Sequence, residues 1–412
     1  MKLTDTEKRV LDGSEGWAKQ TALSILKDLG ELYDAPCFIP VSSVHIDMTL
    51  YLAEAGLDFT ETMAEKGGRF SVPTSLNPSA ADLLRPEALR VSPEICEKNE
   101  RLDRAFLSMG AAATRTCAPY QSGLVPRFGE HLAWGESNAI AFSNSIIGAR
   151  TNRIADLMDV CAAVAGRTPL FGLHITENRK ARKKIVLDGF TDSDFQNPGI
   201  YPLIGFTAGK MAGDDVAAVS GMPAGVPVDS LKGLLAGAAS SGAVGLMHLV
   251  GITPEAQTEE MCLAGNIDEF VMTPKDITAS LESLTRSESR RPELVVLGCP
   301  HYSFQEFRIL EQALQGRKIH HDQKLWAFTS RAVYAFIAEA GILGKLVKAG
   351  VNVFTDACPL FYPSENWHFE TIASDSAKFV NYCHSQTGRK SVYLSTSACV
   401  ETAVAGKIPE GL

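Results

Sequence analysis

Apolar runs of strand length alternate with helical patterns through most of the last two thirds of the chain. In the final third, "ELVVLGCPH", "KLWAFTS" and "VNVFTDACP" are separated by the helical segments "FQEFRILEQALQG" and "RAVYAFIAEAGILGKLVKAG". The middle third repeats the pattern, and its apolar segment "YPLIGFTAGKM" at 201–211 is interpreted as a strand. Such alternation is typical of βαβ units, so the sequence predicts an α/β protein with parallel sheets flanked by helices.

The length of the chain, 412 residues, allows two or three domains with cores of their own. We expect an N-terminal region over 1–165, an α/β domain over 166–290 and a second α/β domain over 291–412. Between 113 and 152, Ser, Asn, Gly and Thr dominate and no long periodic segment is visible. A loop region of this length in a compact domain is usually functional. The N-terminal region is therefore predicted to carry irregular, Ser/Asn-rich active-site loops.

The composition excludes several classes of partner. The net charge of -9 argues against nucleic-acid binding, which favours a basic balance. No apolar run approaches 18 residues, so we expect no membrane span. The polar N-terminus has no apolar core of a secretory signal. Together with nine cysteines, this predicts a reducing, cytoplasmic location in which the cysteines are free thiols or metal ligands.

Three cysteines differ from the others in their local sequence. Cys299 and Cys358 each follow an apolar run and precede a proline, and Cys117 stands before Ala-Pro in "RTCAPY". Ligands gather at the carboxyl ends of parallel strands, where the first two of these cysteines are expected. The remaining cysteines fit small buried apolar side chains: Cys37, Cys96, Cys161, Cys262, Cys383 and Cys399.

Widely spaced thiolates leave several kinds of chemistry open. The sequence has no CxxC motif, so a zinc ribbon or a ferredoxin-type motif is absent. Three thiolates that converge can hold an iron–sulfur cluster in which one iron keeps an open position for a substrate oxygen. One alternative is a thiol nucleophile formed by Cys299 with His301, and another is a structural zinc site in a scaffold without chemistry of its own.

Six segments in this order resemble the aconitase X family: "GGRFSVPTSLNP", "TCAPY", "GESNAIAFSNSIIGARTNR", "SSGAVGLMHLVGITPEA", "GCPH" and "TDACP". The resemblance runs over nearly the whole chain. It implies an aconitase-like multi-domain fold that lacks the small swivelling domain. It also implies that Cys117, Cys299 and Cys358 bind a [4Fe–4S] cluster, a [2Fe–2S] cluster or a single iron.

The resemblance further implies a dehydratase acting on a small hydroxy acid. The first expectation is the large catalytic subunit of an enzyme that converts cis-3-hydroxy-L-proline to Δ1-pyrroline-2-carboxylate, with iron as the Lewis acid for the leaving hydroxyl. The alternative within the family is the large subunit of a mevalonate 5-phosphate dehydratase. Either enzyme needs a small subunit that carries the swivelling domain and a catalytic serine.

Polar residues in the small-residue loops supply the rest of the predicted site. Glu136 is expected to donate a proton to the leaving hydroxide if burial raises its pKa, and His45 is expected to be a polar partner in the pocket. The arginine fork suits a substrate carboxylate. The predicted substrate-binding residues are Arg69, Thr74, Ser75, Asn77, Ser137, Asn138, Asn144 and Arg150.

Overall fold

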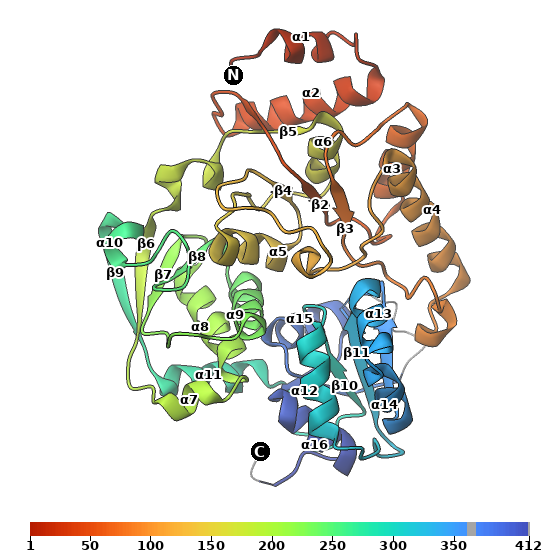
Figure 1. Ribbon diagram of the computed structural model, residues 1–412, viewed down its shortest axis with the longest axis vertical. Helices are drawn as coiled ribbons and strands as arrows, with labels where there is room; N and C mark the ends of the chain where they lie inside the picture. Colours follow the sequence, from red (N-terminus) through yellow and green to blue (C-terminus); the bar gives the residue numbers. More distant parts are fainter. Residues whose placement is uncertain (361–367, 411–412) are drawn as a thin grey trace.

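Three parallel sheets, each with helices packed against it, occupy successive parts of the chain (Figure 1). The computed structural model describes residues 1–360 and 368–410. The predicted α/β architecture with parallel sheets is confirmed. The domain boundaries given above stay a prediction. No helix in the described ranges is long and apolar enough to cross a membrane.

The first part of the chain contains a three-stranded parallel sheet in the order β3-β2-β4, and a small antiparallel pair, β1-β5. Its strands are β1 (Phe38–Pro40), β2 (Val44–Ile46), β3 (Thr74–Leu76), β4 (Ala133–Trp134) and β5 (Arg167–Pro169). Its α-helices are α1 (Asp5–Leu11), α2 (Trp17–Leu32), α3 (Glu54–Glu65), α4 (Pro93–Met109), α5 (Ser137–Phe142) and α6 (Met158–Ala165). Short helical turns are η1 (Pro86–Leu89), η2 (Pro119–Gln121), η4 (Gly172–His174) and η5 (Thr176–Arg179), and η3 (Ser143–Ile147) is a π-helix.

The second part contains a four-stranded parallel sheet in the order β8-β7-β6-β9. Its strands are β6 (Ala181–Leu187), β7 (Ala217–Ser220), β8 (Met247–Leu249) and β9 (Leu263–Met272). Its helices are α7 (Asp192–Gln196), α8 (Ile200–Ala212), α9 (Val228–Ser241), α10 (Glu259–Cys262) and α11 (Pro274–Leu284).

The third part contains a five-stranded parallel sheet in the order β12-β11-β10-β13-β14. Its strands are β10 (Leu294–Leu297), β11 (Lys324–Thr329), β12 (Val351–Thr355), β13 (Thr371–Ser374) and β14 (Lys390–Tyr393). Its helices are α12 (Phe304–Leu314), α13 (Arg331–Glu339), α14 (Ile342–Ala349), α15 (Ala377–Thr387) and α16 (Thr396–Ala405). From β10 the chain first builds β11 and β12 on one side and then crosses to β13 on the other, so the direction of winding switches between β10 and β13.

Two local predictions are wrong. The segment at 201–211 lies in helix α8 and is not a strand. Most of α8 is buried, and a helix that is apolar on every side gives no amphipathic period to separate it from a buried strand. Residues 137–147, predicted as irregular, form α5 and the π-helix η3. Their small Ser, Asn and Ala side chains are largely buried, so they pack as a short core helix that polarity alone does not reveal.

Helices α8 and α9 pack closely because glycines face the opposing backbone. A Cβ placed on Gly205 would lie 1.8 Å from the carbonyl oxygen of Leu234, and one on Gly237 would lie 2.4 Å from the carbonyl oxygen of Pro202. No side chain fits at such distances without moving one helix. These two helices join the second sheet to the rest of the molecule, since α9 also contacts α5 and α15.

The close contact of α8 with α9 predicts that Gly205→Ala is strongly destabilising. We expect it to lower the free energy of unfolding by about 3 kcal/mol or more, because the added methyl overlaps backbone. Gly344→Ala in α14 is the matched control, since nothing lies within 4 Å of its Cβ position. The control is expected to raise stability by up to about 1 kcal/mol through helix propensity. Circular dichroism melting of both variants checks this; equal melting temperatures would contradict it.

Candidate metal and substrate site

The three selected cysteines lie on loops that meet at the carboxyl ends of strands. Cys299 follows β10 by two residues and Cys358 follows β12 by three, whereas Cys117 lies on the loop before η2. The thiols of Cys117 and Cys299 interact electrostatically, as do those of Cys299 and Cys358. The first part of the chain reaches this place directly, because the backbone N–H of Cys358 donates to the carbonyl of Ser79 at 2.9 Å.

The side chain and backbone of His301 join the three cysteine loops. Its backbone N–H donates to Sγ of Cys117 at 3.2 Å. Its ring Nδ1 lies 3.1 Å from Oγ1 of Thr116, and Nε2 lies 3.0 Å from the carbonyl oxygen of Ala357. Because a carbonyl only accepts, Nε2 carries the proton and Nδ1 accepts from the threonine hydroxyl. Burial lowers the pKa of His301 to about 4, which keeps the ring neutral, as this pattern requires.

The thiols of Cys117 and Cys299 are protonated in the metal-free protein. Burial raises the pKa of Cys299 to about 12 and, helped by the Glu136 carboxylate, raises that of Cys117 well above its usual range. Thiolates bind metals and thiols do not, so a cation must replace these protons. Sulfur donors select soft centres such as iron–sulfur clusters, zinc or copper(I). Three thiols near one another, with an N–H donor to one sulfur, therefore suit a soft metal centre, and an iron–sulfur cluster is one such group.

A buried ion pair of Glu136 with Lys378 lies beside these thiols. Glu136 is the N-cap of α5, where its Oε2 accepts from the backbone N–H of Ala139 at 2.6 Å. Its Oε1 lies 2.5 Å from Nζ of Lys378, which also donates to Oγ of Ser137 at 3.1 Å. Burial is the largest single influence and would raise the pKa of Glu136, but the Lys378 ammonium and the backbone N–H groups of Ala139 and Asn138 together outweigh it and hold that pKa below its ordinary value. The carboxylate is therefore ionised, and the expected rise in its pKa is wrong.

A second group of predicted residues comes from the ends of β2 and β3. Nδ1 of His45 lies 2.7 Å from Oγ of Ser75, and burial lowers the pKa of His45 to about 4. The side-chain amide of Asn77 donates to Oδ1 of Asp47. Burial, together with Glu136, raises the pKa of Asp47 well above its ordinary range. Glu136 thus links this group electrostatically to the cysteines.

Three buried polar atoms of these residues have no hydrogen bond of good geometry among the described residues: Nε2 of His45, Oδ1 of Asn77 and Oδ1 of Asn138, although the side chains of His45 and Asn77 interact weakly with each other. Asn138 is fixed by its other amide atom, which donates to the carbonyl of Cys117 at 3.2 Å and to the hydroxyl of Tyr120 at 3.1 Å. Buried polar atoms are nearly always satisfied, so these unpaired atoms need a partner. They indicate the positions that a bound molecule or cofactor would satisfy.

A cavity of about 320 Å³ opens beside Cys299 at the switch point between β10 and β13. Ligands of doubly wound sheets bind at such points. Its lining includes three acidic side chains, Asp229, Glu306 and Asp375, and one lysine, Lys232. The ammonium of Lys232 is already paired with Glu306, so the lining carries an excess of acidic groups.

Two predicted residues, Arg69 and Thr74, lie at the opposite end of their strand. Arg69 precedes β3, its side chain is exposed, and it donates to the carbonyl of Gly68 at 2.7 Å. The hydroxyl of Thr74, at the start of β3, donates to the carbonyl of Val72 at 2.9 Å. Asn77 follows the carboxyl end of the same strand. The structure therefore does not bring Arg69 or Thr74 together with the cysteine group.

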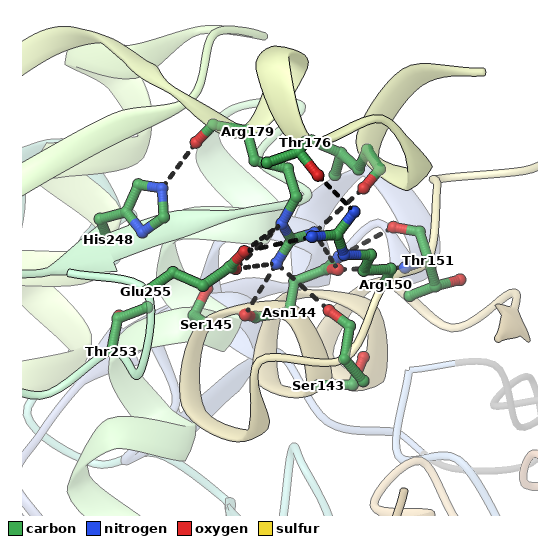
Figure 2. A network of polar contacts seen from close by, with 12 residues as sticks. Ser143, Asn144, Ser145, Arg150, Thr151, Thr176, Arg179, His248, Thr253 and Glu255 are labelled. Atoms are coloured by element: carbon green, nitrogen blue, oxygen red, sulfur yellow. Dashed lines mark hydrogen bonds and ion pairs between the residues drawn. The ribbon is translucent and has the colours of Figure 1, made fainter. Parts of the chain in front are cut away.

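Two others, Asn144 and Arg150, belong to a separate buried network centred on Arg179 (Figure 2). Asn144 uses both ends of its amide on the protein, including 3.0 Å to Nη1 of Arg179. Arg150 donates to Oγ1 of Thr176 at 2.8 Å and lies 3.9 Å from Glu255. Arg179, only 2% exposed, pairs with Glu255 and donates to carbonyls at both ends of η3. This network fixes the π-helix and leaves Asn144 without free donors or acceptors for a substrate.

Comparison with known proteins agrees with this description. Three family models match in order: the aconitase X first domain at residues 1–177, the second at 184–282 and the third at 292–405. The chain is 34% identical to a cis-3-hydroxy-L-proline dehydratase of Pseudomonas aeruginosa, over 98% of this chain and 70% of that protein. It is 35% identical to a phosphomevalonate dehydratase large subunit of Methanothermobacter thermautotrophicus, over 95% and 96% respectively.

A solved structure, the holo-form of Thermococcus kodakaraensis aconitase X, superimposes with a TM-score of 0.88 at 30% identity, covering 98% of this chain and all of that one. The curated relatives are named as dehydratases, which places the chain among the hydro-lyases. The chain belongs to the aconitase X family.

Sequence reasoning missed the charged partners of the predicted residues. Lys378 is separated from Glu136 by 242 positions, and Arg179 from Glu255 by 76. Nothing in the local sequence marks either pairing. Asp47 was passed over although it lies only two residues after His45 in "VHIDM"; a carboxylate directly after a buried strand was the one available signal.

The Arg179–Glu255 pair predicts a large loss of stability in Arg179→Met. Removing the guanidinium leaves Glu255 and the carbonyls at both ends of η3 without their donor. The free energy of unfolding should therefore fall by about 3–5 kcal/mol. Arg182→Met, at an exposed position of β6, is the control and should change stability by less than about 0.5 kcal/mol. Denaturant unfolding measures both, and a small effect at Arg179 would show that the network is not stabilising.

Proposed function

We propose that this chain is the large catalytic subunit of an iron-dependent dehydratase that converts cis-3-hydroxy-L-proline to Δ1-pyrroline-2-carboxylate. The carrying observation is the group of three cysteine thiols beside a buried carboxylate–ammonium pair at the carboxyl ends of parallel strands. Family membership and a 34% identical relative of that name support the reaction. We expect the enzyme to work in the cytoplasm, where thiols stay reduced.

Cys117, Cys299 and Cys358 would hold an iron–sulfur cluster or a single iron. Iron bound there would supply a Lewis acid for the leaving hydroxyl, and the α-proton taken by the partner's base would balance the released hydroxide as water. The ionised Glu136 accepts hydrogen bonds from Lys378, from Ser137 and from the backbone N–H groups of Ala139 and Asn138, so its negative charge is held in place and would act on the substrate hydroxyl electrostatically. Glu136 therefore positions the leaving group and does not protonate it.

The unpaired buried atoms support an amino acid as substrate. Oδ1 of Asn77 and Oδ1 of Asn138 only accept hydrogen bonds, and the secondary ammonium of hydroxyproline donates two. The neutral ring of His45 offers Nε2 as a further polar contact. Because the base is expected on the partner, these residues bind and orient the substrate while its α-proton is removed.

Mevalonate 5-phosphate is the second candidate substrate. Phosphomevalonate dehydratase large subunits match this chain over nearly their full length, which favours the same two-subunit arrangement. A phosphate dianion, however, only accepts hydrogen bonds and needs cations around it. Oδ1 of Asn138, which only accepts, suits the ammonium of hydroxyproline better than a phosphate, so hydroxyproline is the better substrate.

A small subunit would complete the enzyme. The chain spans 70% of the Pseudomonas aeruginosa relative but nearly all of the archaeal large subunits. We propose that the remaining part is a separate small chain that carries the swivelling domain and a catalytic serine as the base. The large subunit alone would then bind iron and turn over hydroxyproline very slowly.

The proposal predicts that each thiol is needed for iron. Serine in place of Cys117, Cys299 or Cys358 should remove most of the bound iron and lower activity by at least about 100-fold, because a hydroxyl is a far weaker ligand for iron than a thiolate. The measurement is anaerobic co-expression with the small subunit, followed by iron and sulfide analysis and assays with both substrates.

Cys37→Ser is the control, since this half-buried thiol directly precedes β1 and its backbone pairs with Lys2, so the variant should keep iron and activity. Colourless protein that contains zinc and turns over neither substrate would favour the scaffold alternative. Turnover of mevalonate 5-phosphate alone would keep the dehydratase and overturn the substrate.

A further inference from the structure

Lys378 occupies an unfavourable place for a positive charge. It lies in the first turn of α15, two residues after the N-cap Ser376, where the helix dipole favours anions. Its side chain is only 11% exposed, and that of Glu136 only 5%. Lysine is among the residues least often buried, because its ammonium loses strong hydration.

Stability does not account for this pair. A buried ion pair is weak evidence for stabilisation, since the desolvation of both charges offsets their attraction. Two apolar side chains of the same volume would avoid the free-energy cost of taking two charges out of water. The ammonium instead matches the carboxylate beside it: Glu136 raises the pKa of Lys378 above its ordinary value despite burial.

Both hydrogen bonds of Lys378 lead to the carboxylate of Glu136, one directly and one through Ser137. Nζ lies 2.5 Å from Oε1 of Glu136, and the second contact, Ser137, donates its own hydroxyl to the same oxygen at 3.2 Å. The backbone N–H of Ala139 fixes the other oxygen. The carboxylate is thus held at both ends and cannot rotate freely.

We propose that Lys378 is a positioning residue of the dehydratase: its ammonium holds Glu136 as an ionised carboxylate directed at the cysteine group, and the two residues act as one unit. The reaction in which Lys378 takes part rests on the proposed function. The ionised state of Glu136 does not depend on that function. Other titratable groups that interact with Glu136 are Asp47, His45, Tyr120, His301 and the two thiols, Cys117 and Cys299. None of these supplies a positive charge at neutral pH, since His45 and His301 are neutral there.

The test uses the iron-loaded complex with the small subunit and four variants: K378M, K378R, E136Q and K378M/E136Q. K378M should lower kcat by about 100-fold with KM changed less than about threefold, because orientation is lost while the substrate contacts remain. K378R should recover at least about tenfold of that loss, since it keeps the charge. The double variant should be no slower than the slower single one, because the two residues share one role.

Two readouts separate positioning from a structural or metal-holding role. Iron per chain should match the wild type in K378M, whereas its melting temperature should fall because Glu136 loses its buried partner; loss of iron would mean that Lys378 holds the cofactor, and would overturn the proposal. Infrared spectra should show a protonated carboxylic acid in K378M that is absent from K378M/E136Q. Absence of this band would mean that Glu136 stays ionised without Lys378, and would also overturn it.

K348M, at an exposed position of α14, is the matched control and should change none of these quantities. Wild-type complex that holds iron but dehydrates neither substrate would refute the proposed function, and the infrared comparison would still decide the role of Lys378. Wild-type activity that persists undiminished in K378M would refute the inference and leave the proposed function intact.

Discussion

The contacts of His301 hold together chain segments that are far apart in the sequence. One residue donates its backbone N–H to Cys117 and uses both ring nitrogens on the loops next to Cys117 and Cys358, while its own loop carries Cys299. Its carbonyl in turn accepts from the buried ammonium of Lys232 at 3.0 Å. A neutral imidazole is suited to this task because it offers one donor and one acceptor on opposite sides. The convergence of the three thiols depends on this geometry.

The sequence predicted the parts of the fold and site that have a local pattern. Strand-length apolar runs between amphipathic helices indicated parallel sheets, and Cys299 and Cys358 were selected because they follow such runs. Residues 201–211 and 137–147 were misinterpreted because buried helices lack the contrast between an apolar and a polar face. Where helices are buried on every side, helix length and close glycine contacts identify a helix better than the period of its apolar residues does.

The charges of the site could not be predicted, since they depend on contacts between distant segments. Burial alone suggested a raised pKa for Glu136, and the opposite direction follows only once Lys378 is placed 2.5 Å away. Likewise, Arg150 and Asn144 looked like substrate ligands because small polar residues surround them. Arg179 and Glu255 use those same neighbours to fix the π-helix instead (Figure 2). Loop composition identified the region and not the roles within it.

The unpaired atoms of His45, Asn77 and Asn138 show what kind of site this is. Each buried polar atom without a partner costs about 1–3 kcal/mol, and nearby hydrogen bonds hold all three side chains so that they cannot turn away. The rigid frame that includes His301, Glu136 and Lys378 therefore carries this cost before any ligand binds. A ligand that supplies the missing hydrogen bonds recovers it on binding, without reorganising the protein. Selectivity then follows from the match of donors to acceptors, and a phosphate, which only accepts, cannot satisfy the two amide oxygens.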